Sequence, residues 1–268
     1  HISNQSNICK KKLLFKWSHY GATILGTRAP WTIIKEEASK KGEIYLGSML
    51  FNNGVGRYSR HTLTKLRSES LSTKKLHIVR VVEQFELQHH ANPIVPSTRG
   101  SKAISQADIN NDTNLNGDTE LHGPFEWKDF GYTNNLSDAE VSNLSRTMSD
   151  LYHAHSKNEA IYFHCKAGVN RSFRMTALFL TYCKIQDNVK NSTIKISELQ
   201  LEDWIMEHCA MIWDKRPCVC FNRHEWLSQL KAIKSMLLSM WKDRINTREK
   251  HNSELKQLRL NCQYEMYS

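Results

Sequence analysis

The sequence predicts an α/β fold in which a central, mostly parallel, twisted sheet is flanked by helices. Short segments typical of strands lie at residues 43–48, 76–82 and 159–163. Segments with apolar residues at helical spacing include 61–67 and 137–155. A chain in which strands alternate with helices in this way builds a parallel sheet that the helices cover.

The length of 268 residues is enough for one large domain, or for one domain with an extension. We expect a domain over residues 43–242, preceded by an extension at 1–42 that packs on it and followed by a helical tail at 243–268. The net charge of +10 favours an anionic partner. The chain has no run of eighteen apolar residues and begins without a signal-peptide pattern, so we expect no membrane span.

The first half of the predicted domain contains one segment of unusual composition. Residues 76–82 are predicted to form a core strand, and the loop at 83–88 should border the functional pocket. Residues 89–123 are rich in Asn, Asp, Ser and Thr, which indicates a polar loop insertion. Residues 112–117 match the first half of a calcium loop, but Gly123 stands where such a loop needs a glutamate. We therefore prefer a polar surface loop to a calcium site.

The second half is predicted to be mostly helical. The segment 137–155 begins with the capping pair Ser137 and Glu140 and keeps its apolar residues on one face. Further helices are expected at residues 173–182, 196–213 and 226–240. Beyond Lys242 the chain is mostly charged, which leaves open a protruding helix, a partner-binding arm or a frayed, solvated helix.

The most informative segment is the loop from His164 to Ser172, between a predicted strand and a predicted helix. A loop that ends at a helix N-terminus presents unpaired backbone N–H groups to an anion, and the helix macrodipole adds to the attraction. Gly168 suits a tight curl of successive N–H groups. The loop is therefore predicted to bind a phosphate group.

The side chains of this loop add a nucleophile. Cys165 stands where a helix N-terminus and nearby cations lower the pKa of a thiol, and the thiolate is the attacking form. Arg171 has the planar fork that grips two phosphate oxygens. Ser172 can hydrogen-bond the sulfur and ease its departure, and His164 is interpreted as a brace for the loop. The phosphate would be held by the backbone of Lys166, Ala167, Gly168, Val169 and Asn170. A buried structural cysteine is the alternative, but this combination and spacing favour the phosphate loop.

Cys165 and Arg171, with five residues between them, resemble the signature loop of the cysteine-dependent protein tyrosine phosphatase superfamily. His164 before the cysteine and Ser172 after the arginine fit the same pattern. A second similarity lies at residues 215–230, which resemble the Arg-Pro…Asn…Gln-Leu segment of dual-specificity phosphatases. Within the superfamily, the chain therefore resembles the dual-specificity group most.

The resemblance also implies a general acid. Trp127-Lys128-Asp129 looks like the Trp-Pro-Asp loop of tyrosine phosphatases, with Lys128 in place of the proline. Asp129 precedes Cys165 by 36 positions (165 − 129), a separation similar to the family's. We expect Asp129 to protonate the leaving oxygen from a movable flap, with Trp127 in a supporting role. Asp138 is the competing carboxylate, but its capping pattern favours a helix start.

The resemblance implies hydrolysis of a phosphomonoester in two steps, through a phosphocysteine intermediate and without a metal or other cofactor. A phosphorylated protein, carrying phosphotyrosine, phosphoserine or phosphothreonine, ranks first as substrate. A phosphoinositide in an anionic phospholipid surface, or an inositol phosphate, ranks second. The reason is that a lysine inside the loop, as at Lys166, is also found in phosphoinositide phosphatases. RNA 5′-triphosphate ranks third. Asn170 before Arg171 resembles the loop of RNA 5′-triphosphatases, but no nucleic-acid motif is present. The alternative from another class is a pseudophosphatase that binds phosphate without turnover.

The cysteine content indicates the compartment. Seven cysteines at irregular spacing are typical of reduced thiols in a reducing environment. Cys218 and Cys220 form the only close pair, and no second pair completes a zinc pattern. We therefore expect an intracellular, cytoplasmic protein, and the Asn- and Lys-rich composition leaves open a secreted bacterial effector that acts in the host cytosol.

Overall fold

The computed structural model describes residues 30–35, 41–52, 61–71, 74–88, 103–111, 118–127, 136–193, 195–216, 223–242 and 245–246. The chain divides into two compact units. The sheet unit comprises residues 22–132 and 146–176, and the helical unit comprises 1–21, 133–145 and 177–268. Asp129, the calcium-like segment at 112–117 and most of the tail lie outside the described residues.

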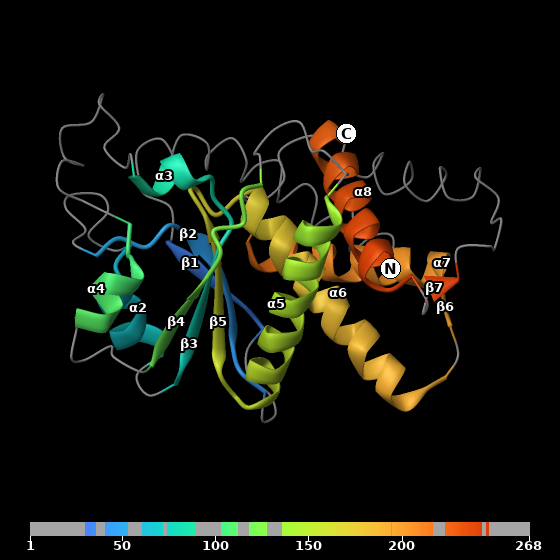
Figure 1. The fold of residues 1–268 in the computed structure, drawn as a ribbon, viewed down its shortest axis with the longest axis horizontal. Helices are drawn as coiled ribbons and strands as arrows, with labels where there is room; N and C mark the ends of the chain where they lie inside the picture. Colours follow the sequence, from blue (N-terminus) through green and yellow to red (C-terminus); the bar gives the residue numbers. More distant parts are fainter. Residues whose placement is uncertain are drawn as a thin grey trace. The chain divides into compact units, whose positions relative to one another are not determined.

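The sheet unit is built on five strands in the order β1-β2-β5-β3-β4 (Figure 1). The strands are β1 (Trp31–Lys35), β2 (Ile44–Ser48), β3 (Leu76–Arg80), β4 (Thr119–His122) and β5 (Ala160–Cys165). Strand β1 is antiparallel to β2, and the other three pairings are parallel. The central strand β5 is buried at every position, as expected for a strand covered on both faces. The predicted α/β fold with a mostly parallel sheet flanked by helices is confirmed.

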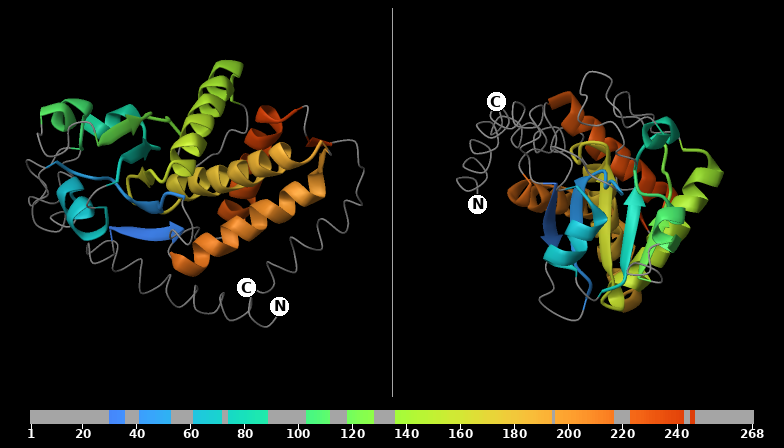
Figure 2. Two further views of the ribbon diagram at one scale, coloured as in Figure 1. Left: turned by 90° about the horizontal axis from the view of Figure 1, so that it is seen from below. Right: turned by 90° about the vertical axis from the view of Figure 1, so that its left-hand side faces the viewer.

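One face of the sheet is covered by two short helices, α2 (Leu63–Ser70) and α4 (Gln106–Asn111), which lie beside it in both views (Figures 1 and 2). Residues that alternate along a strand point to the same face. The cluster on this face contains Tyr45, Leu76, Ile78 and Tyr162 from the strands, Leu63 and Leu66 from α2, and Ile109 from α4. Thr62 caps the N-terminus of α2, because its hydroxyl accepts from the backbone N–H of Lys65.

Two segments contain strands or a helix that the sequence did not predict. Residues Trp31–Lys35, assigned to an extension, form the edge strand β1, because Trp31 and Ile33 pack against the apolar cluster. The polar segment 89–123, predicted to be a loop, contains α4 and β4. Strand β4 has little apolar pattern of its own and is fixed by main-chain pairing with β3. The wider domain boundaries remain a prediction.

Two long helices continue from one unit into the other: α5 (Asp138–Ser156) and α6 (Arg171–Asn191). Helix α5 was predicted from its apolar periodicity and α6 from its apolar run, and Ser137 with Glu140 forms the expected reciprocal cap of α5. The hydroxyl of Ser137 accepts from the backbone N–H of Glu140, whose carboxylate accepts from the backbone N–H of Ser137. The sequence therefore located the starts of these helices to within two residues.

The helical unit contains α7 (Glu198–Lys215), α8 (Arg223–Met240) and the short parallel pair β6 (Ile196–Ser197) and β7 (Ile245–Asn246). Ser197 caps α7 by accepting from the backbone N–H of Gln200 at 3.1 Å. Lys234 of α8 forms ion pairs with Glu198 and Glu202 of α7. The predicted long C-terminal helix is thus α8. Within the described part of the chain, none of the helices combines the length and apolarity needed to cross a membrane.

Candidate active site

The predicted phosphate loop joins the central strand to a long helix. Strand β5 ends at Cys165, and α6 begins at Arg171. The parallel register places Ser48 of β2 opposite Cys165. It also places Arg80 of β3 opposite His164. The carboxyl ends of three strands therefore meet at the loop, which is where parallel α/β sheets place their ligand sites.

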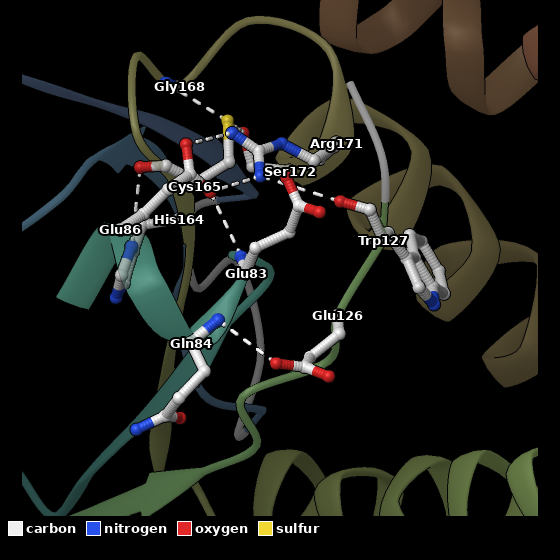
Figure 3. A network of polar contacts seen from close by, with 10 residues as sticks. All are labelled: Glu83, Gln84, Glu86, Glu126, Trp127, His164, Cys165, Gly168, Arg171 and Ser172. Carbon is white, nitrogen blue, oxygen red and sulfur yellow. Dashed lines mark hydrogen bonds and ion pairs between the residues drawn. The ribbon is translucent and has the colours of Figure 1, made fainter. Parts of the chain in front are cut away.

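The sulfur of Cys165 has two polar partners from its own loop (Figure 3). The backbone N–H of Gly168 donates to Sγ at 3.2 Å, and the hydroxyl of Ser172 lies 3.3 Å from it. Cys165 is otherwise buried in a small apolar cluster with Met49, Phe51 and Val82. Hydrogen bonds to a charged form favour that form, so the loop is built to support a thiolate.

Gly168 is required by the curl of the loop. Its φ of +68° lies in the left-handed region that side chains disfavour. A Cβ atom at this position would also lie 2.4 Å from the carbonyl oxygen of Gly47 and 2.7 Å from the backbone nitrogen of Ser48. No residue with a side chain fits there without moving the end of β2. The prediction that a glycine is needed for a tight curl is therefore confirmed by the backbone.

The guanidinium of Arg171 is held by a carboxylate that the sequence did not single out. Glu86 lies in α3 (Gln84–Gln88), and its two oxygens accept from Arg171 Nη1 at 2.5 Å and Nη2 at 2.9 Å. Both side chains are buried. Nη1 also lies 3.4 Å from the carbonyl oxygen of Trp127. The arginine is therefore fixed between α3 and the segment that follows β4.

Glu86 is ionised at neutral pH. Burial alone raises the pKa of its carboxyl group, but hydrogen bonds from Arg171 and from the backbone N–H of Glu83 lower it. The positive charges of Arg171 and Lys166 act in the same direction, and the resulting pKa lies below the ordinary value. A buried carboxylate and a buried guanidinium thus neutralise each other beside the loop.

Two further contacts hold the segment that follows β4, one from α3 and one from α6. The backbone N–H of Gln84 donates to the carboxylate of Glu126 at 3.0 Å. The guanidinium of Arg174, one turn into α6, lies over the indole ring of Trp127, 4.8 Å from its centroid. In Figure 3 the Trp127 carbonyl faces Arg171 while its ring points away from the sulfur. Trp127 is therefore tied to the loop two residues before Asp129.

His164 is buried and neutral. Its Nδ1 lies 3.3 Å from the carbonyl oxygen of Cys165, to which an Nδ1–H would donate. Burial is the main cause that lowers the pKa of this imidazole to about 3; the positive charges of Arg80 and Arg171 act in the same direction, while the hydrogen bond to Cys165 and the charge of Glu86 oppose the shift. A histidine in this state keeps one ring proton and does not take up a second at neutral pH, so it does not act as a base. Its burial and its contact with the Cys165 carbonyl are consistent with the predicted role of a brace for the loop.

The structure brings together most of the predicted site residues: His164, Cys165, Gly168, Arg171, Ser172 and Trp127. Lys166 is exposed and Ala167 is half-buried, whereas Val169 and Asn170 are buried in the loop. Asp129 and Lys128 lie outside the described residues. Glu86 was missed as a site residue, although it lies in the segment 83–88 that the sequence placed at the border of the pocket. An acid in that loop was the available signal.

No family model matches the sequence, and no curated protein matches it. Among solved structures, the chain is similar to PTPMT1 in complex with PI(5)P, at 17% identity over 79% of this chain and 97% of that one, with a TM-score of 0.44. It is also similar to Tk-PTP in the active form, at 14% identity over 76% of this chain and 96% of that one, with a TM-score of 0.41. Human DUSP28 matches at 13% identity over 78% and 96%, with a TM-score of 0.36.

These matches are likenesses of fold. Because the TM-scores lie below 0.5, the roles of individual residues rest on the geometry of the loop itself.

Proposed function

We propose that the protein is a cysteine-dependent phosphatase that hydrolyses phosphomonoesters through a phosphocysteine intermediate. The observation that carries this proposal is the loop from Cys165 to Arg171. Its sulfur accepts from the backbone N–H of Gly168 and lies beside the hydroxyl of Ser172, at the N-terminus of α6. A helix N-terminus favours an anion, and hydrogen-bond donors directed at sulfur favour the thiolate.

In the first step, the Cys165 thiolate attacks phosphorus, a P–S bond forms and the P–O ester bond breaks. Asp129 donates the proton that the leaving oxygen needs, as the resemblance implies. The backbone N–H groups of the loop and the guanidinium of Arg171 stabilise the negative charge on the equatorial oxygens.

In the second step, water attacks phosphorus and the P–S bond breaks. Asp129 now accepts a proton from the water, and inorganic phosphate is released. The hydroxyl of Ser172, 3.3 Å from the sulfur, can donate to the departing thiolate and lower the energy of that step. No metal enters either step of this scheme.

Glu86 is proposed as the residue that positions Arg171. Two hydrogen bonds from a buried carboxylate fix the guanidinium before substrate arrives. A group that is already oriented loses less conformational entropy when the phosphate binds. Glu86 does not touch the reacting atoms in this scheme, so its effect is exerted through Arg171.

A phosphorylated protein is the substrate class that we propose. The dual-specificity resemblance supports it, and the net charge of +10 suits acidic phosphopeptides. A phosphoinositide or inositol phosphate is the second candidate. The observation in its favour is the exposed side chain of Lys166, which adds a cation at the loop.

The proposal is tested by a turnover panel at two salt concentrations. The substrates are phosphotyrosine and phosphothreonine peptides, soluble inositol phosphates, phosphoinositide vesicles and triphosphate-ended RNA. We expect the peptides to be the best substrates. Strong, salt-sensitive turnover confined to the vesicles or the RNA would replace the phosphoprotein assignment with that class.

Three variants test the chemistry. Cys165→Ser should abolish turnover and still bind phosphopeptide, whereas Cys183→Ser, at another buried cysteine of α6, should retain activity. Asp129→Ala should slow substrates with poor leaving groups by about 10²–10⁴-fold. Phosphopeptide binding without turnover by the unaltered protein would identify a pseudophosphatase instead. Unchanged turnover in Asp129→Ala would remove that residue from the mechanism.

A further inference from the structure

A second cluster of polar side chains lies on the sheet, between β3 and β4. It consists of His77, Glu120 and His122, and one ligand atom from each lies within 4.8 Å of the others. His77 pairs with Ile161, four residues before Cys165 along β5. The phosphatase scheme uses none of these three residues.

The strand register explains why the three side chains meet. His77 of β3 lies opposite Glu120 of β4 in a parallel pair, and His122 follows two residues later. Residues two apart on a strand point to the same face. His77 Nδ1 lies 3.0 Å from His122 Nε2 and 3.7 Å from a Glu120 oxygen. The other Glu120 oxygen lies 3.9 Å from His122 Nε2.

The other nitrogen of His77 is held by a carboxylate from outside the cluster. His77 Nε2 lies 2.6 Å from an oxygen of Glu159, directly before β5. A neutral His77 therefore carries its proton on Nε2 and directs the lone pair of Nδ1 towards Glu120 and His122. Metal-ligating histidines are oriented in this way, with the second ring nitrogen donating to a carboxylate.

The ring of His122 faces that of His77, with its Nε2 3.0 Å from Nδ1 of His77. Without a metal, the Nε2–H of His122 can donate to Nδ1 of His77. A metal ion bound by both nitrogens would replace the proton of this hydrogen bond.

We propose that His77, Glu120 and His122 form a binding site for Zn²⁺ or a similar divalent transition-metal ion, with Glu159 as a positioning residue. Two imidazoles and one carboxylate are a donor set that zinc accepts, with water at the fourth position. Zn–N distances of about 2.0–2.1 Å put two nitrogens on a tetrahedral ion roughly 3.3 Å apart. The 3.0 Å separation is therefore close to what such an ion needs.

The cluster reaches solvent at the side chain of Glu120. Glu120 is half exposed and pairs with Lys75 at 3.1 Å, an exposed contact that is worth little and that Glu120 can exchange for a metal. His77 and His122 are both more than four-fifths buried, which fixes their rings. A metal at this position would cross-link the edge strand β4 to β3.

The test uses the full chain, stripped of metal, and Co²⁺ as a spectroscopic probe that Zn²⁺ then displaces. We expect one equivalent of Co²⁺ with the visible spectrum of nitrogen and oxygen ligands. Cysteine ligation is recognised by the near-ultraviolet charge-transfer band of a cobalt thiolate. Glu159→Gln should weaken binding by about 10–100-fold, as expected when an orienting carboxylate is removed. His122→Gln should weaken it at least as much.

The matched control is His153→Gln, which removes an exposed histidine of α5 and should leave metal affinity unchanged. Circular dichroism and the metal-free melting temperature establish that each variant is folded. If His122→Gln does not fold, Glu120→Gln takes its place, because that side chain is half exposed. Wild-type affinity in these variants, or a spectrum of thiolate ligation only, would overturn the metal site. Neither result depends on phosphatase turnover.

Discussion

Arg171 and Glu86 form a buried ion pair in which two guanidinium nitrogens meet two carboxylate oxygens, at 2.5 and 2.9 Å. The pair connects the first residue of α6 to α3, 85 positions earlier in the chain. A buried charge that loses its partner is costly, because neither an opposite charge nor water then compensates it. The orientation of Arg171, the proposed phosphate-binding arginine, therefore depends on one acid of α3.

Glu86→Ala should destabilise the fold and impair phosphate binding. Removal of one member of a buried ion pair typically costs about 3–5 kcal/mol, so we expect a loss of that order in the free energy of unfolding. Urea denaturation measures it, and steady-state kinetics with a phosphopeptide should show a raised KM and a lowered kcat.

Glu83→Gln is the matched control for this change. It alters a carboxylate in the same segment, where Glu86 contacts the backbone N–H of Glu83 and not its side chain. Equal stability of the two variants would mean that the ion pair contributes nothing to the fold. Unchanged KM and kcat in Glu86→Ala would separate Glu86 from the positioning of Arg171.

Gly168→Ala should disable the loop. The added methyl group would approach the Gly47 carbonyl to 2.4 Å, and a positive φ strains any side chain. Strain of this kind costs about 1–3 kcal/mol before the backbone clash is counted. We expect a lower melting temperature and loss of turnover, while the neighbouring change Ala167→Gly retains the fold. Full activity of Gly168→Ala would show that the loop curls differently in solution.

Acid sensitivity should depend on His164. The pKa of this imidazole is about 3 in the folded protein and about 6.5 when it is exposed. Between these two pH values, the unfolded chain binds a proton on His164 and the folded chain does not. The resulting stability is fully present above pH 6.5 and is lost as the pH falls towards 3, by about 1.4 kcal/mol per pH unit within that window.

His164→Asn removes this titration and keeps an N–H donor near the Cys165 carbonyl. Its free energy of unfolding, measured by urea denaturation from pH 7 to pH 4, should fall less steeply than that of the unaltered protein. His153→Gln, at an exposed position, should leave the slope unchanged. Identical slopes in all three proteins would mean that His164 is protonated in the folded state.

The parts that the sequence predicted well are those that local pattern controls. The apolar runs that became β3, β5 and α6 and the periodic segment that became α5 carry their own signals of burial. The predicted phosphate loop could be recognised because Cys165 and Arg171 lie close together in sequence. These elements need little information from the rest of the chain.

The parts that were missed depend on contacts between distant residues. Strand β4 is short and only partly apolar, and its pairing with β3 decides its structure. Glu86 gains its role only where the fold brings it against Arg171. His77 and His122 lie 45 positions apart and meet through strand register. No local pattern marks such residues, because the folded sheet creates their neighbourhood.

Ser172→Ala should slow the second chemical step more than the first. The Ser172 hydroxyl lies 3.3 Å from Cys165 Sγ, where it can stabilise the thiolate that leaves when phosphocysteine is hydrolysed. Its removal should lower kcat roughly tenfold or more, since a hydrogen bond to a charged group is worth about 1.5–3 kcal/mol. Rapid-quench kinetics should then show a burst of the leaving group, and mass spectrometry should detect the phosphoenzyme.

The control is Thr176→Val, which removes a hydroxyl that donates to the Ser172 carbonyl one turn along α6. An unchanged rate in Ser172→Ala, or a slowed rate without a burst, would place the limiting barrier before phosphocysteine and remove the leaving-group role from Ser172.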